Sequence, residues 1–300
     1  MNHGEELPPQ KRRRLSPPPV NGNGRPAEFL PAPPPRLEPS FIGYDPFDDF
    51  TKQVADWIAD MIRGKEDVEV EGKIGIVFDE LLNRRIDLPV LSETIISPSV
   101  KDRRFQSTMT VNQHRHYNDL LNKRVELSAT APPSMFMKFA HTRGIDSFYK
   151  VPDDEGKVRV RVSRDEKTGD ITESVKKTRL GDMDVLCPRW AFDYRISVNK
   201  ELPSDPPAQE VRPERLRRKD RVSYTHQAYR IDLTQVYPHP APAKGEAGIT
   251  HELEVEFLNS AVLVRECAKR DKGEPSMFDE MIQVFLNNIR ILIRSAVPPE

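Results

Sequence analysis

Three stretches of the chain carry apolar residues at the three- and four-residue spacing of a helix with one buried face. The first has Asp45 as its N-cap and Pro46 as its first residue, and its apolar positions are Phe47, Phe50, Val54, Trp57, Ile58 and Met61. The second runs from about residue 110 to 127, and the third from about 276 to 295. The apolar stripe of the third is so broad that we expect this helix to be buried beneath a sheet.

Seven further stretches alternate apolar and polar residues with a period of two, which is typical of β-strands. They cover residues 68–78, 158–163, 174–180, 192–198, 217–224, 228–236 and 250–258. Residues 203–213 are expected to form an exposed loop. At least seven strands in one domain favour a closed barrel, since closure removes exposed edges. The pattern therefore predicts a mainly β (α+β) fold, a closed antiparallel barrel with helices packed outside.

The first forty residues show no apolar period. They contain 11 of the 28 prolines and the basic run from Lys11 to Arg14. We interpret residues 1–40 as a disordered Pro-rich basic tail and residues 41–300 as one folded domain. The basic run is either a short nuclear import signal or a solvated charge cluster.

The overall charge excludes one mode of binding. Among 300 residues, 46 Lys and Arg balance 47 Asp and Glu, so the net charge is −1 and capture of a long nucleic acid by bulk electrostatics is not expected. Two cysteines are too few for a disulfide framework or a Cys-rich zinc site. No run approaches the roughly 18 apolar residues of a membrane span, so we expect no membrane partner.

Two of the predicted strands carry rows of carboxylates on one face. Glu69 and Glu71 alternate in the first, and Glu252, Glu254 and Glu256 alternate in the last. Neighbours on one face of a strand lie about 7 Å apart, so carboxylates from two strands can converge on a hard cation such as Mg²⁺ or Mn²⁺.

Other predicted strands carry cations at alternate positions. These residues are Arg159, Arg161, Lys177, Arg179, Arg195, Lys219, Arg221 and Arg230, the last followed by Asp232 and Thr234. If all these faces point inward, the barrel encloses a pocket for a polyphosphate and its cation. The alternative is a non-catalytic module in which these rows are solvated faces and the Pro-rich tail docks partner proteins.

Three segments resemble the motifs of one enzyme family. Residues 68–75, 218–224 and 251–257 are similar to signature motifs of the fungal RNA 5′-triphosphatases, the β subunit of the mRNA capping apparatus, which are triphosphate tunnel metalloenzymes. The resemblance extends from about residue 45 to 295. It implies an eight-stranded barrel in residues 41–300 and a metal-dependent enzyme that removes the γ-phosphate of nascent pre-mRNA in the nucleus, the first step of capping.

The resemblance also implies roles for individual residues. The carboxylates that would hold Mg²⁺ or Mn²⁺ are Glu69, Glu71 and Glu256, with Glu252 and Glu254 completing the acidic wall. The cations that would contact phosphate are Arg161, Lys177, Lys219 and Arg221, ordered by Arg230, Asp232 and Thr234. Lys177 is preferred to Lys176 because it shares a strand face with Arg179. Glu201 matches a glutamate that orients the attacking water.

The partners implied by the resemblance are triphosphate-ended RNA, the mRNA guanylyltransferase (the capping enzyme α subunit), the RNA polymerase II tail and a second copy of the chain. The alternative within the same fold is a hydrolase of tripolyphosphate or of a nucleoside or thiamine triphosphate. The cysteine signature of the metazoan capping triphosphatases is absent, and so is a separate Trp-containing docking peptide, because the only tryptophans are Trp57 and Trp190.

Overall fold

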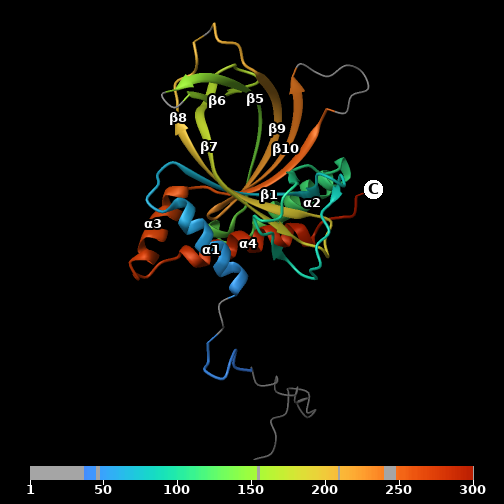
Figure 1. The fold of residues 1–300 in the computed structure, drawn as a ribbon, viewed down its shortest axis with the longest axis vertical. Coiled ribbons are helices and arrows are strands. Elements are labelled where there is room, and N and C mark those ends of the chain that lie inside the picture. The colour runs from blue at the N-terminus through green and yellow to red at the C-terminus, as the bar shows by residue number, and fades with distance from the viewer. Residues whose placement is uncertain (1–36, 45–47, 154–155, 209, 240–247, 300) are drawn as a thin grey trace, which may run out of the picture. The chain divides into compact units, whose positions relative to one another are not determined.

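Eight long antiparallel strands close into a barrel above a layer of helices (Figure 1). The computed structural model describes residues 37–44, 48–153, 156–208, 210–239 and 248–299. The barrel strands are β1 (Val68–Asp79), β5 (Lys138–Asp153), β6 (Gly156–Asp165), β7 (Ile171–Leu186), β8 (Asp193–Pro203), β9 (Arg215–His226), β10 (Tyr229–His239) and β11 (Thr250–Phe257). They are hydrogen-bonded in the order β11-β10-β9-β5-β6-β7-β8-β1, and pairing of β1 with β11 closes the ring. The expected closed eight-stranded barrel is therefore confirmed.

The chain divides into two units, residues 1–46 and 47–300, and the barrel belongs to the second. Of the first unit the structure describes residues 37–44, where the Ser40 hydroxyl donates a 2.5 Å hydrogen bond to the Tyr44 carbonyl. The expected tail and the basic run lie outside the described residues. The boundary near residue 40 stays a prediction.

Three short strands extend one end of the barrel. They are β2 (Arg84–Arg85), β3 (Thr94–Ile95) and β4 (Arg103–Gln106). β4 pairs with the last residues of β1, which run on beyond their pairing with β11, while β3 pairs with β7. Gly75 permits the close approach of β4, because a Cβ atom there would lie 2.2 Å from the Gln106 carbonyl oxygen.

The helices are α1 (Asp49–Ile62), α2 (Val111–Ser128), the single 3₁₀ turn η1 (Pro133–Met135), α3 (Ser260–Asp271) and α4 (Phe278–Arg294). All three helical stretches expected from the sequence are present. In Figure 1, α1, α3 and α4 lie beneath the floor formed by β1. No helix in these parts of the chain is long and apolar enough to span a bilayer.

The start of α1 corrects the expected N-cap. The cap is Asp48, not Asp45, because its carboxylate accepts hydrogen bonds from the Phe50 amide at 3.2 Å and the Thr51 hydroxyl at 2.7 Å. Pro46, expected as the first helical residue, lies outside the described residues.

The core lies between α4 and the outward faces of the floor strands. Phe285 and Ile289 of α4 are fully buried, and both approach Gly72 of β1. Val255 and Leu253, which alternate with the carboxylates of β11, are also fully buried. Alternation therefore sends the apolar residues of β1 and β11 outward into the core and their charged residues into the barrel.

The sequence pattern missed the short elements β2, β3, β4 and η1, and it also missed two longer ones, β5 and α3. β5, the eighth barrel strand, has polar residues on both faces, so it lacks a clear period of two. α3 buries few residues, among them Leu263 and Cys267, and so has only a narrow stripe. Its one clear sequence signal is the N-cap Asn259, whose side chain accepts hydrogen bonds from two amides of the first turn.

Candidate active site

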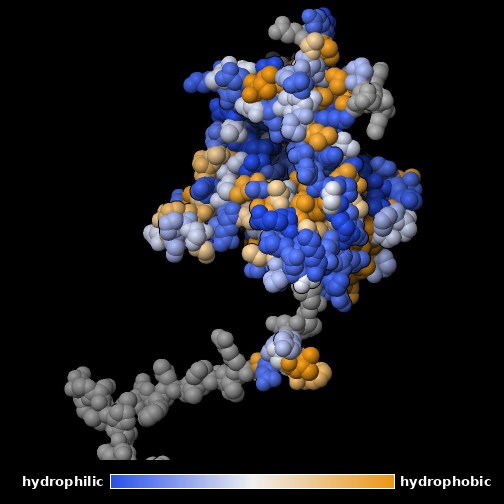
Figure 2. Space-filling model, turned by 90° about the vertical axis from the view of Figure 1, so that its left-hand side faces the viewer, coloured by the Kyte–Doolittle hydropathy of each residue, from blue (hydrophilic) through white to orange (hydrophobic). Residues whose placement is uncertain are grey.

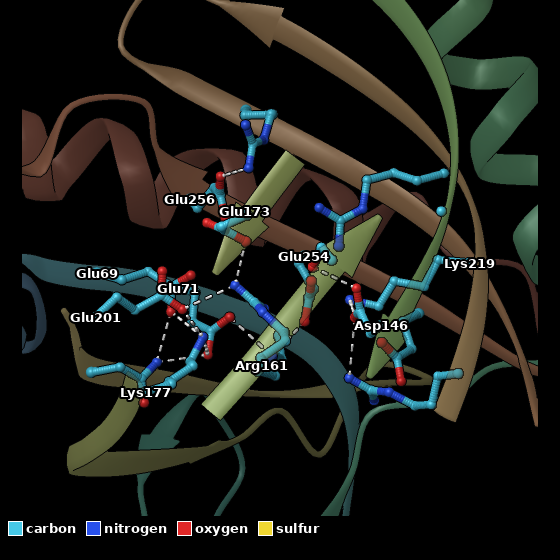
Figure 3. Close-up of a pocket in the computed structure, with 18 of the residues that line it drawn as sticks. Glu69, Glu71, Asp146, Arg161, Glu173, Lys177, Glu201, Lys219, Glu254 and Glu256 are labelled. Carbon is cyan, nitrogen blue, oxygen red and sulfur yellow. Dashed lines mark hydrogen bonds and ion pairs between the residues drawn. The ribbon is translucent and has the colours of Figure 1, made fainter. Parts of the chain in front are cut away.

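The interior of the barrel is a cavity of about 960 Å³ lined mainly by charged and polar side chains. Residues of all eight strands line it. Figure 3 shows the labelled side chains converging on the interior from several of these strands. The outer face seen in Figure 2 is also mainly hydrophilic, with apolar residues in small groups. The hypothesis that the carboxylate rows are solvated faces is wrong, because Glu71 and Glu254 are only 3% and 9% exposed.

The carboxylates of β1 are held by groups from β7 and β8. Asn199 donates hydrogen bonds to Glu69 at 2.8 Å and to Glu71 at 3.0 Å. Lys177 forms a very short ion pair with Glu69 and lies 3.8 Å from Glu71. Glu201, opposite Lys177 in the strand register, completes this group with a 3.0 Å ion pair. These side chains lie together on one side of Figure 3.

The carboxylates of β11 differ in their surroundings. Lys73 bridges Glu254, by a very short contact, and Glu71, at 3.0 Å. Burial disfavours the charged form of Glu254, but Lys73 and then Arg221 outweigh it and hold its pKa well below the usual range. At Glu256 the balance is reversed. Burial, reinforced by nearby carboxylates and only partly offset by the ion pair with Arg230, raises the pKa of Glu256 to about 8.

Arg161 connects the two sides of the cavity. Its guanidinium pairs with Glu173 at 2.7 Å and with Glu201 at 3.5 Å. Burial opposes its charge, but Glu173 and Glu201 outweigh that effect and raise its pKa. Figure 3 shows it between the group around Lys177 and the group around Lys219.

Lys219 lies on the opposite wall with Asp146 of β5. The ion pair measures 2.5 Å, and Ser163 donates a 2.7 Å hydrogen bond to the other oxygen of Asp146. Burial, together with the neighbouring Arg221 and Arg217, lowers the pKa of Lys219, and the ion pair with Asp146 offsets part of this shift. A second anion beside Lys219 would therefore be stabilised.

Arg221 and Arg230 are ordered by β10. Asp232 lies 3.0 Å from Arg221 and 3.2 Å from Arg230, and it is almost fully buried. Thr234 accepts a 3.1 Å hydrogen bond from Arg221. The strand register explains this arrangement, since Thr234 is directly opposite Arg221.

The carboxylates suit a hard cation in their chemistry. Glu71 and Glu256 are direct partners in the pairing of β1 with β11. Burial raises the pKa of Glu256, and a divalent cation bound beside it would favour its charged form. In the described part of the chain, however, no three Asp, Glu, His or Cys side chains are already arranged around one point, because Lys73, Lys177 and Arg230 pair with these carboxylates instead.

All thirteen residues singled out from the sequence lie in this interior or against its wall. Five further residues that take part in the contacts described above, or line the cavity beside them, were not among these thirteen: Lys73, Asp146, Glu173, Asn199 and Arg217. The sequence could have identified two of them, because Arg217 continues the period of two from Lys219, and Asn199 continues it from Arg195. Asp146 had no such signal, since its strand was not recognised.

Known proteins resemble the chain over most of its length. A family described as "mRNA capping enzyme, beta chain" matches residues 44–297. The mRNA-capping enzyme subunit beta of Schizosaccharomyces pombe is 34% identical over 87% of this chain and 86% of its own length. That of Cryptococcus neoformans is 36% identical over 86% of this chain and 64% of its own length. Two solved structures of the S. pombe Pct1 RNA triphosphatase, one in complex with the Spt5 CTD, superpose with a TM-score of 0.80 at 33–34% identity and cover 87–88% of this chain and 99–100% of theirs.

Proposed function

Because the chain belongs to the family of mRNA capping enzyme β chains, we propose that it is an RNA 5′-triphosphatase that removes the γ-phosphate of nascent pre-mRNA, the first step of capping. The observation that carries this proposal is the barrel interior, where carboxylates and cations from eight strands face one another in a closed, polar cavity. A triphosphate needs both kinds of group, since its own charge requires cations and a bound metal ion requires carboxylates.

The cations of the cavity would bind and orient the phosphates. Lys177, Arg161, Lys219 and Arg221 come from three strands and surround the central space. In phosphoryl transfer, negative charge develops on the transferred group and on the leaving oxygen, so fixed cations around both lower the barrier. Glu201, which pairs with both Lys177 and Arg161, would orient the attacking water.

Mg²⁺ or Mn²⁺ is the proposed cofactor. Glu69, Glu71 and Glu256 would hold it, with Glu252 and Glu254 completing the acidic wall. Bound there, the cation would supply charge stabilisation for the phosphoryl oxygens. The lysines that now pair with these carboxylates would then be free to contact phosphate instead.

The proposed partners follow from the family. They are triphosphate-ended RNA and the guanylyltransferase that acts on its product, in the nucleus. An S. pombe relative has been solved with the Spt5 CTD, which supports the proposal that this chain too contacts such a segment. A contact with the RNA polymerase II tail stays a prediction. A homodimer stays a prediction.

Release of labelled phosphate from γ-labelled triphosphate-ended RNA tests the function, with Mg²⁺, with Mn²⁺ and with a chelator. We expect metal-dependent release that falls at least about 100-fold in Glu71→Ala and in Glu254→Ala, since each removes a buried charge partner of Lys73. The control is Glu80→Ala, which removes an exposed carboxylate just after β1. Release that persists with the chelator, or survives both substitutions, would contradict the proposal. Parallel assays with tripolyphosphate and ATP separate RNA from the alternative substrates.

A further inference from the structure

The two open ends of the barrel differ in chemistry. Because the strands are antiparallel, the N-termini of β1, β5, β7 and β10 lie at one end, with the C-termini of β6, β8, β9 and β11. Four carboxylates that line the cavity lie toward this end, which we call the carboxylate end: Glu69, Glu173, Glu201 and Glu256.

The opposite end, which we call the aromatic end, carries two phenylalanine rings that line the cavity. Phe105 belongs to β4, which pairs with the last part of β1, and Phe148 lies toward the end of β5. An arginine lies over each ring: Arg195 is 5.1 Å from the centre of Phe105, and Arg217 is 4.7 Å from that of Phe148. Both arginines lie near the N-termini of their strands, β8 and β9.

Arg159, near the start of β6, adds a cation to the aromatic end. It lines the cavity and is exposed, and it forms no ion pair with any residue that the structure describes. The cations deeper in the cavity, such as Lys177, Arg161 and Lys219, are all paired with carboxylates. Arg159 is therefore available to a phosphate of the bound substrate.

Phenylalanine rings beside unpaired or stacked arginines are the features that bind single-stranded nucleic acid. Bases stack on aromatic side chains and on guanidinium planes, while the phosphodiester contacts cations. At the carboxylate end, Arg161 and Arg230 are already paired with Glu173, Glu201 and Glu256, so these cations are not free to bind a phosphodiester chain.

On the premise that the chain hydrolyses triphosphate-ended RNA, we propose that the RNA occupies the aromatic end. The first nucleosides lie against Phe105 and Phe148, and Arg159 contacts a phosphodiester. The triphosphate points inward, with its γ-phosphate nearest the carboxylate end. In-line attack supports this polarity, because the leaving oxygen must lie opposite the attacking water, and Glu201 lies toward the carboxylate end.

The chain offers a matched pair of arginines to test the polarity. Arg159 and Arg164 are on the same strand and both line the cavity, but Arg164 is near the end of β6, at the carboxylate end. The measurement is the Kd of a short triphosphate-ended RNA with a 3′ fluorophore, by fluorescence anisotropy. We expect Arg159→Ala to raise the Kd about 5- to 10-fold and Arg164→Ala to change it less than about 2-fold.

A second variant tests the aromatic rings. Phe105→Leu with Phe148→Leu keeps apolar volume but removes both stacking faces, and we expect the Kd for RNA to rise about 10-fold. The affinity of inorganic tripolyphosphate, measured by competition, should change less than that of RNA, since it has no nucleoside. Thermal unfolding checks that the variants fold.

The outcomes separate this proposal from the proposed function. If the wild type releases phosphate from RNA but Arg164→Ala weakens binding and Arg159→Ala does not, the polarity is reversed and this inference fails alone. Equal loss of RNA and tripolyphosphate affinity in the phenylalanine variant also overturns it. If the wild type binds RNA with the expected variant pattern but releases no phosphate, the proposed function fails and the polarity holds.

Discussion

Asp146 illustrates how a single buried residue sets the charge state of a neighbour. It is the direct counter-ion of Lys219, whose pKa burial and two arginines already lower. The residue is 4% exposed, so water cannot replace it. Its influence on phosphate binding is therefore exerted through Lys219.

Asp146→Asn should lower kcat for phosphate release about 10- to 100-fold. The amide keeps the volume but loses the charge, so Lys219 loses its counter-ion and its pKa falls further. Steady-state kinetics between pH 6 and 9 measure this, and activity should recover toward lower pH more than in the wild type. Asp220→Asn is the control, because Asp220 pairs with Arg143 and His141 on the other face of the strand that carries Lys219. Equal losses in the two variants would contradict the role of Asp146.

The burial of His114 makes the stability of the fold depend on pH. Its ring is 8% exposed, its Nε2 atom has no hydrogen-bond partner among the described residues, and the ring centre lies 4.9 Å from that of His251. Burial, and then His251, lower the pKa of His114 to about 4. In the unfolded chain, His114 takes up a proton near pH 6.5, whereas in the folded chain it does so only near pH 4. The contribution of His114 to the free energy of unfolding is therefore fully present above pH 6.5 and is lost as the pH falls toward 4.

The free energy of unfolding should therefore fall by about 2–3 kcal/mol between pH 7.5 and 4.5 on account of His114. Urea denaturation at several pH values measures it. In His114→Gln this part of the pH dependence should disappear, whatever the variant's stability at pH 7.5. A pH dependence identical to that of the wild type would contradict the prediction.

At the scale of elements, the junction of β1 and β4 is set by one glycine. A Cβ at residue 75 would lie 2.2 Å from the Gln106 carbonyl oxygen and 2.9 Å from the Phe105 ring. Backbone cannot give way as a side chain does, so the two strands would have to separate.

Gly75→Ala should lower the free energy of unfolding by about 2–3 kcal/mol, because the added methyl overpacks the strand pair. Thermal or urea denaturation measures it. Gly72→Ala is the matched control on the same strand, where the close atoms are the ends of the Ile289 and Phe285 side chains, which can shift. A smaller cost at residue 75 than at residue 72 would show that β4 moves freely.

At the scale of the whole molecule, a net charge close to zero coexists with a barrel interior that is rich in charged side chains. The net charge is −1, yet the barrel interior contains lysines and arginines from several strands. The electrostatic attraction is therefore local to the cavity.

The Kd for triphosphate-ended RNA should change less than about 3-fold as the RNA grows from about 5 to 30 nucleotides, because few phosphates beyond the first nucleotides meet a cation. Anisotropy with RNAs of increasing length measures this, and RNA ending in a hydroxyl is the control. A Kd that falls steadily with length would instead show an external basic path.

The sequence predicted much of the fold because the floor strands separate their two faces sharply. Val255 and Glu254 are adjacent, and one belongs to the core while the other belongs to the cavity. The same alternation, read from the local sequence, identified the carboxylates and cations that line the cavity. The sequence pattern did not predict β5, because its interior face and its solvent face are both polar. A strand shows a period of two only when its two faces differ in polarity.

For the strands whose two faces differ in polarity, the sequence by itself determined which residues share a face, since alternation depends only on the geometry of a strand. Which of them touch was decided by the tertiary structure. Lys177 meets Glu69 across 108 positions of chain, and Lys219 meets Asp146 through the pairing of β9 with β5. The order of the strands around the barrel and their register create these pairs, and neither can be predicted from the local sequence of a single strand.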